Sequence, residues 1–178
     1  MKKLRLIALF LLMGIVSTAG FAQSDKEQKL IKEADAAVAE MLKADPGLKE
    51  YFDKAAGCAV FPNVGKGGLI IGGASGNGIL YEYGKKIGVA SLKELNVGLQ
   101  AGGEALMEVI FFEKKADVDK FKEGKFEFAA GVSATAVKSG ASMNAKYRDG
   151  VAVFTHTKRG LMADASVGGQ KFKFKPFE

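Results

Sequence analysis

The spacing of glycine most constrains the fold of this chain. Residues 57–103 contain 13 glycines in 47 positions, separated by apolar runs of four or five residues. These runs are too short and too broken for helices, whereas glycine lets neighbouring strands approach closely and bend. The segment therefore predicts strongly curved strands joined by tight turns, including a hairpin turn at residues 75–78, Ser-Gly-Asn-Gly.

Residues before Gly57 have a helical pattern instead. Ser24 and Glu27 fit a capping box, which predicts a helix that begins at this point. The apolar residues that follow recur at helical spacing: Leu30, Ile31, Ala34, Val38, Met41 and Leu42. Asp45 and Pro46 predict a second, shorter helix that ends at Gly57. Because the charges of the first helix nearly cancel, we expect it to pack on a sheet rather than insert into a membrane.

The remainder of the chain is predicted to be mainly β. A mostly apolar run at 105–112 predicts a strand buried on both faces, and residues 114–122 predict one helix. The other strand candidates are 58–61, 68–71, 78–81, 87–90, 97–101, 125–128, 132–137, 142–147, 151–155, 162–167 and 171–174. Helices followed by many strands indicate an α+β fold, with N-terminal helices packed on a strongly curved, glycine-rich antiparallel β-sheet that is barrel-like.

The first 22 residues have the pattern of a secretory signal peptide. Lys2, Lys3 and Arg5 precede an apolar run at 6–16, and small residues precede the expected cleavage after Ala22. The alternative, a membrane anchor, requires a longer apolar run to cross about 30 Å of hydrocarbon. We therefore expect an exported protein, periplasmic in a cell with two membranes and otherwise secreted. Its single domain would comprise residues 23–178, helical over 24–57 and mainly β over 58–178, with a short helix near 114–122.

Charge and composition narrow the classes of function. The whole chain carries a formal charge of +6, but residues 23–178 carry 23 basic and 20 acidic groups, a net of +3. Residues 113–178 hold 13 basic and 8 acidic groups, so the surplus lies in the C-terminal third. The apolar content of 48% excludes intrinsic disorder. Nucleic acid is not an expected partner, because no helix presents an arginine stripe.

The residues that carry most enzyme chemistry are scarce. His156 is the only histidine and Cys58 the only cysteine. We expect Cys58 to be a buried, inert thiol rather than part of a Cys–His dyad, and His156 to be a half-exposed surface group rather than a proton shuttle. The pattern predicts no catalytic residues, no metal site, no cofactor and no enzyme activity.

Two groups of basic residues remain as candidates for binding. The glycine-rich run 65–73 lacks P-loop spacing, so its glycines are interpreted as structural or, alternatively, as a backbone cradle for an anion near Lys66. Lys171 and Lys173 alternate with phenylalanine along a predicted strand, and Lys158 with Arg159 adds to this cluster. The cluster is consistent with an edge strand protected from aggregation or with a surface for anionic lipid headgroups.

Several motifs resemble those of the SYLF domain family, in the order that the family has them. They are residues 55–78, 96–104, 121–126 and 158–163, and the likeness covers roughly residues 30–170. The resemblance implies binding rather than catalysis, because SYLF domains are described as binding phosphoinositides and membranes, and some relatives as bundling actin. It supplies no residue-level site. Lys66, Lys158, Arg159, Lys171 and Lys173 are therefore candidates from their charge alone.

These observations predict a non-catalytic protein of the cell envelope that binds an anionic phospholipid or a phosphoinositide-like headgroup. The expected partner is an anionic membrane surface. An alternative is an interaction or structural module of the envelope that holds a protein partner and binds no lipid.

The signal-peptide hypothesis predicts a defined mature N-terminus. When the full chain is expressed in a bacterium with two membranes, intact-mass spectrometry of the periplasmic fraction should find a protein that begins at Gln23. Ala22→Phe should leave residues 1–22 attached, because the position before the cleaved bond requires a small side chain. A periplasmic protein with the mass of the whole chain would contradict the hypothesis.

Overall fold

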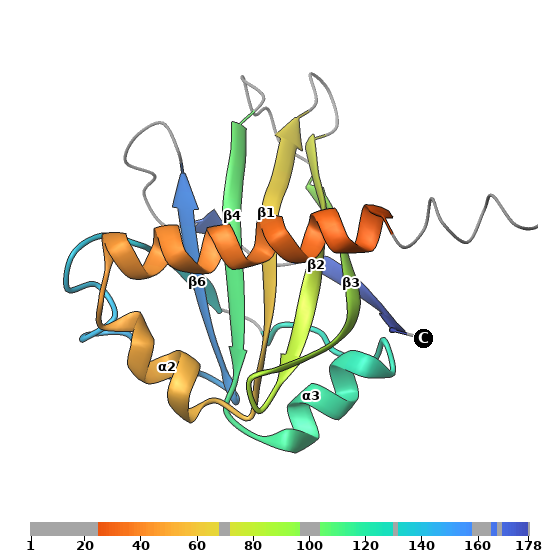
Figure 1. The fold of residues 1–178 in the computed structure, drawn as a ribbon. Helices are drawn as coiled ribbons and strands as arrows, with labels where there is room; N and C mark the ends of the chain where they lie inside the picture. Colours follow the sequence, from red (N-terminus) through yellow and green to blue (C-terminus); the bar gives the residue numbers. More distant parts are fainter. Residues whose placement is uncertain are drawn as a thin grey trace, which may run out of the picture.

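A computed structural model describes residues 25–67, 72–96, 104–129, 132–157, 165–166 and 169–177 (Figure 1). Side chains are not described at 66–67, 72–73, 95–96, 104–105 and 165–166. A long N-terminal helix covers residues 25–44, and the elements after it are α2 (Leu48–Lys54), β1 (Gly57–Gly67), β2 (Gly72–Glu82), β3 (Lys85–Asn96), β4 (Glu104–Phe112), α3 (Lys115–Lys122), β5 (Ser133–Ala136), β6 (Val151–Thr157), β7 (Ala165–Ser166) and β8 (Gln170–Pro176).

The strands form one sheet in the order β7-β5-β6-β4-β1-β2-β3-β8. All described pairings are antiparallel except that of β5 with β6, which is parallel. The α+β class with N-terminal helices on a glycine-rich sheet is thus confirmed. The expected antiparallel sheet contains one parallel pair, and it is open, because β7 and β8 lie at opposite ends of the order.

Contacts between distant strands show how strongly the sheet curls. Gln170 on β8 lies four strands from Glu108 on β4, which in a flat sheet would separate them by about 19 Å. The Gln170 amide nitrogen nevertheless lies 3.3 Å from a Glu108 carboxylate oxygen. The rings of Phe61 on β1 and Phe172 on β8 are 6.1 Å apart. The concave face of the sheet therefore closes around its own side chains.

The two faces of the sheet bury separate apolar cores. The N-terminal helix crosses one face of the strands (Figure 1) and buries Ala34, Ala37 and Met41 there. The concave face holds a core rich in phenylalanine, including Phe112 and Phe121, which α3 helps to cover. The predicted packing of the first helix on the sheet is confirmed.

Polar contacts hold the N-terminal helix in place on the sheet. Asp35 accepts a hydrogen bond of 3.2 Å from the Tyr81 hydroxyl and one of 2.7 Å from the Lys86 ammonium. Burial raises the pKa of Tyr81, and the nearby Asp35 charge raises it further, so the phenol stays a donor. These bonds tie the helix to β2 and β3.

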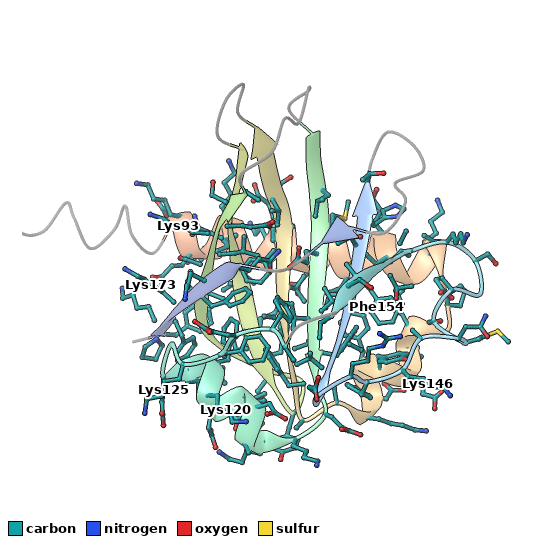
Figure 2. The ribbon with its side chains drawn as sticks, turned by 180° about the vertical axis from the view of Figure 1, so that it is seen from behind. Lys93, Lys120, Lys125, Lys146, Phe154 and Lys173 are labelled. Atoms are coloured by element: carbon teal, nitrogen blue, oxygen red, sulfur yellow. The ribbon has the colours of Figure 1, made fainter. Side chains whose placement is uncertain are left out.

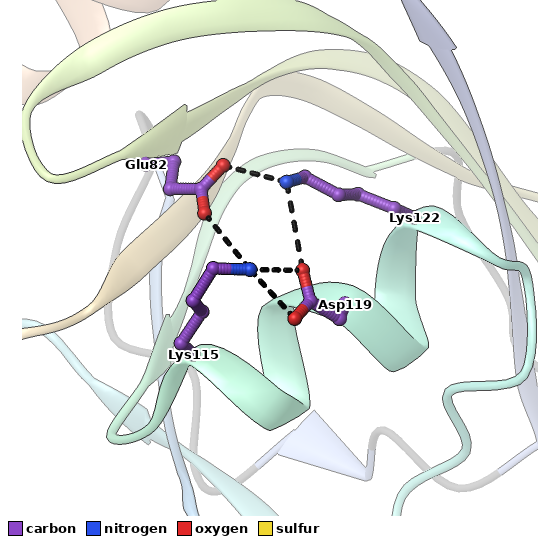
Figure 3. A network of polar contacts seen from close by, with 4 residues as sticks. All are labelled: Glu82, Lys115, Asp119 and Lys122. Atoms are coloured by element: carbon purple, nitrogen blue, oxygen red, sulfur yellow. Dashed lines mark hydrogen bonds and ion pairs between the residues drawn. The ribbon is translucent and has the colours of Figure 1, made fainter.

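The polar contacts of α3 attach it to the end of β2. Lys122 pairs with Glu82 at 2.6 Å and lies 3.6 Å from Asp119 (Figure 3). Lys115 pairs with Asp119 at 2.7 Å and lies 3.7 Å from Glu82. The four alternating charges form a closed ring, and α3 begins one residue after the predicted start at residue 114.

Three local predictions are wrong. Residues 75–78 lie inside β2, and the turn that follows comes at Tyr83 and Gly84, both with positive φ. The alternating residues 125–128 form no strand, because Phe126 packs into the concave core from a coil segment. Residues 142–147 form turns and coil rather than a strand.

The second helix is present but spans Leu48–Lys54, so it is shorter than expected at both ends. The candidates at 68–71 and 97–101, and most of 162–167, lie outside the described residues.

Close approach of the strands explains several of the glycines. A Cβ at Gly57 would lie 2.6 Å from the carbonyl oxygen of Tyr81, and one at Gly76 would lie 2.7 Å from that of Asn63. At Gly78 and Gly88 a Cβ would lie closer still to the carbonyl oxygens of the neighbouring strands. These glycines act within the strands, where they permit tight curvature, and not as hairpin turns.

Across the described part of the chain, no helix combines the length and apolar character that crossing a bilayer would require.

Substitution of Gly78 tests this requirement for close approach. Gly78→Ala places a methyl group against the Val60 carbonyl, so it should lower the free energy of unfolding by about 1–3 kcal/mol. Gly65→Ala is the matched control, because the nearest atom to its Cβ would be 4.0 Å away, and it should leave stability almost unchanged. Urea denaturation followed by circular dichroism measures both variants. Equal effects at the two positions would contradict the close-approach interpretation.

Asp45 joins the first two helices to a distant loop, and its role can be tested by pH. Its carboxylate accepts hydrogen bonds from the backbone N–H of Ser142 at 2.7 Å and of Gly47 at 3.1 Å, and the side chain is buried. Burial by itself raises the pKa of Asp45, but these bonds to the ionised form outweigh it, and the pKa lies below its ordinary value.

Because the folded pKa is depressed, ionised Asp45 stabilises the fold above its unfolded pKa of about 3.9, and this contribution is lost as the pH falls through the folded pKa. Asp45→Asn should cost about 1–3 kcal/mol at neutral pH, and the difference from wild type should shrink below about pH 4. The exposed Asp53→Asn should cost at most about 0.5 kcal/mol. A pH-independent difference for Asp45→Asn would contradict this account.

Candidate functional site

The lysines predicted near the C-terminus lie on the last strand of the sheet. Lys171 and Lys173 are exposed on β8, while Phe172 between them is buried in the concave core. The predicted alternation is confirmed, and β8 is an end strand of the sheet order. The exposed lysines therefore lie at one edge of the sheet.

Pairing with β3 adds a lysine that sequence patterns did not connect with this cluster. Lys93 is opposite Lys171 in the antiparallel register, and Ser91 is opposite Lys173. Directly opposed residues share a face of the sheet, so Lys93 extends the row of exposed lysines across two strands. Alternation around Lys93 predicts an exposed position, but no local signal connects β3 with a strand almost 80 residues further along.

We use the name basic edge for Lys93, Lys171, Lys173 and Lys175. Two of these lysines have acidic partners: Lys171 pairs with Glu127, and Lys175 lies 3.7 Å from Glu27 on the N-terminal helix. Lys93 and Lys173 have no acidic partner among the described residues. Figure 2 shows both at the same side of the molecule, away from Lys146. The unneutralised positive charge of this edge is concentrated at these two lysines.

The other candidate lysines are not brought to this edge by the described structure. Lys158 and Arg159 lie outside the described residues, directly after β6. The backbone of Lys66 is in β1, and its side chain is not described. Two strands, β2 and β3, lie between β1 and β8. Gly68 to Ile71 also lie outside the described residues, so the alternative of a backbone cradle for an anion stays a prediction.

A groove runs between the N-terminal helix and the basic edge. It has a volume of about 650 Å³, and Leu30, Val89 and Phe174 supply its apolar lining. A second hollow of about 470 Å³ adjoins it, and the two share Leu30, Glu33, Asn77 and Ser91. Lysines from both sides border the first groove: Lys26 and Lys29 on the helix, and Lys173 and Lys175 on β8. The arrangement places positive charge beside exposed apolar surface.

Cys58 and His156 are separated in the sheet. The predicted burial of Cys58 is confirmed, and burial raises the pKa of its thiol to about 12, which disfavours the reactive thiolate. Cys58 pairs with Phe111 on β4, and His156 pairs with Met107 on the same strand. Met107 and Phe111 are four residues apart, which corresponds to about 13 Å along the strand. The His156 side chain is 21% exposed and lies 3.8 Å from Glu40. The two residues cannot form a dyad.

A buried polar cluster joins three strands. The Gln170 amide donates to a Glu94 oxygen at 3.2 Å and to a Glu108 oxygen at 3.3 Å, and each residue is at most 2% exposed. None of the three lines the groove or the hollow beside it. Within the described ranges, no three acidic, histidine or cysteine side chains are grouped to hold a metal ion. The cluster closes the curled sheet from inside.

The fold and this surface define a small α+β domain that presents a basic sheet edge beside an amphipathic groove. A family model described as "Las17-binding protein actin regulator" (Ysc84) matches residues 93–176. The matched region belongs to this family, the SYLF or Ysc84 family, as the sequence motifs predicted. The matched region begins at Lys93, near the end of β3, and includes all of β8, so it contains the four lysines of the basic edge.

A curated relative supports the same assignment. Beta cell expansion factor A of Aeromonas veronii is 34% identical over 142 residues, which cover 78% of this chain and 53% of that protein. The chain therefore spans about half the length of this relative.

Proposed function

We propose that this protein binds anionic lipid headgroups through its basic edge and acts without catalysis in the cell envelope after export. The observation that carries the proposal is the pair of exposed lysines, Lys93 and Lys173, that have no acidic partner among the described residues. Family membership supports a role in binding, since SYLF domains are linked to lipids and to actin regulation.

The geometry suits a membrane surface more than a single multiply charged ligand. The lysines are distributed along two strands of one sheet face instead of converging on a point. Each lysine close to an anionic bilayer contributes about 1 kcal/mol to binding. The basic edge would therefore confer moderate, salt-sensitive affinity, with the membrane lying along the edge of the sheet.

Vesicle co-sedimentation tests the proposal. The protein should bind vesicles that contain phosphatidylglycerol and not vesicles of phosphatidylcholine, and binding should weaken as the Debye length falls from about 10 Å at 0.1 M salt to about 3 Å at 1 M. Lys93→Glu with Lys173→Glu should reduce binding at least about tenfold, because losing two lysine contributions costs about 2 kcal/mol.

The matched control reverses two exposed lysines far from the edge, Lys138 and Lys146, neither of which has an ion-pair partner among the described residues. This control variant changes the net charge by the same amount as the edge variant. If the location of the charge governs vesicle binding, the affinity of the control should stay within about threefold of wild type. Equal loss in both double variants, or equal binding to both kinds of vesicle, would overturn the proposal.

A further inference from the structure

We infer that the groove beside the basic edge holds the chain of a single-chain, singly charged anionic amphiphile, such as a long-chain fatty acid. The inference rests on the proposed function, because Lys173 belongs to both surfaces. It goes further by assigning a ligand class and a separate compartment for the apolar chain.

The floor of the groove is made of apolar side chains that solvent still reaches. Leu30 on the helix and Val89 on β3 are only partly buried and belong to the helix-side core. Phe174 on β8 is also partly buried and lines the groove from the edge strand, where it packs against the concave core. Covering such surface is favourable by about 25 cal/mol per Å². The groove volume of about 650 Å³ lies within the range of about 300–1,000 Å³ typical of small-molecule sites. An acyl chain therefore matches both the size and the chemistry of the floor.

The border of the groove carries charge suited to one negative group. Four lysines and two glutamates line it, and the contacts neutralise two of the lysines: Lys175 lies 3.7 Å from Glu27, and Lys29 lies 3.8 Å from Glu33. Lys26 and Lys173 have no ion pair among the described residues. One carboxylate between the helix side and the strand side could interact with both ammonium groups.

The same border disfavours a multiply charged phosphate. Phosphate recognition usually relies on the planar fork of arginine or on several converging donors. None of the described residues that line the groove is an arginine, and the two glutamates would repel additional negative charge. A singly charged headgroup with an apolar chain is therefore the better complement.

The polar wall of the groove allows it to be blocked without altering a lysine. The Ser91 hydroxyl donates a 2.9 Å hydrogen bond to the Asn77 side chain, and both residues line the groove and the hollow beside it. They lie on paired strands, β2 and β3, where aromatic residues are tolerated well. Ser91→Trp or Asn77→Trp would fill the space above the floor.

The experiment measures binding of cis-parinaric acid, a fatty acid whose fluorescence rises in apolar surroundings, to full-chain protein as the cell processes it. Wild type should bind about one equivalent, and palmitate should displace the probe while inorganic phosphate should not. Ser91→Trp and Asn77→Trp should each weaken probe binding at least tenfold, yet bind phosphatidylglycerol vesicles within twofold of wild type. Lys173→Glu should weaken probe binding, and Lys146→Glu should not.

The two proposals fail in different ways. If wild type does not distinguish anionic from zwitterionic vesicles, the proposed function fails, whatever the probe shows. If both tryptophan variants fold, as judged by urea denaturation, and bind the probe like wild type, the groove inference is overturned. Displacement of the probe by inorganic phosphate, or uptake of many equivalents, also overturns it. The exposed Asn77→Trp keeps the test decisive if Ser91→Trp does not fold.

Discussion

The structure depends on the close approach of backbone between neighbouring strands. At Gly57 and Gly76 a Cβ would lie 2.6 and 2.7 Å from a carbonyl oxygen of the adjacent strand, which no real side chain allows. Glycine at these positions lets β1 and β2 pack and bend more tightly than alanine would permit. Gly88 likewise permits close approach of β3 and β8, because a Cβ there would collide with the Lys175 carbonyl oxygen. The pairing at the edge of the sheet therefore also requires glycine. The curl of the whole sheet follows from this local requirement.

That curl produces two surfaces with different roles. The concave face closes on a phenylalanine-rich core and on the buried Gln170 cluster, so it is filled by the protein itself. The other face is covered in its middle by the N-terminal helix, which Asp35 anchors to Tyr81 and Lys86. Beyond the helix, the face continues to β3 and β8, where the lysines and the groove lie. Both binding proposals concern the strip of sheet that the helix leaves open.

Sequence patterns predicted the helices and strands better than the turns that connect them. The helix around Val118 and Phe121, the strand whose residues 106–112 are all buried, and the alternation around Lys173 were all predictable, because each depends on side chains a few residues apart. The turn at Tyr83 and Gly84 was misplaced to 75–78, since glycine serves turns and close approach equally well. Of the candidate site, Lys171 and Lys173 were predicted, but Lys93 and Lys26 were not, because their relation to β8 is not local.

By itself, the sequence determined the α+β class, the exposure of alternate lysines on β8 and the burial of Cys58, because the period of apolar side chains decides which face of an element leaves water. Only the tertiary structure decided that β3 pairs with β8 and that the N-terminal helix lies beside them. Those choices depend on strand contacts between residues almost 80 positions apart and on helix anchoring across the sheet, which no local pattern specifies. The basic edge and its groove exist only because those distant segments meet.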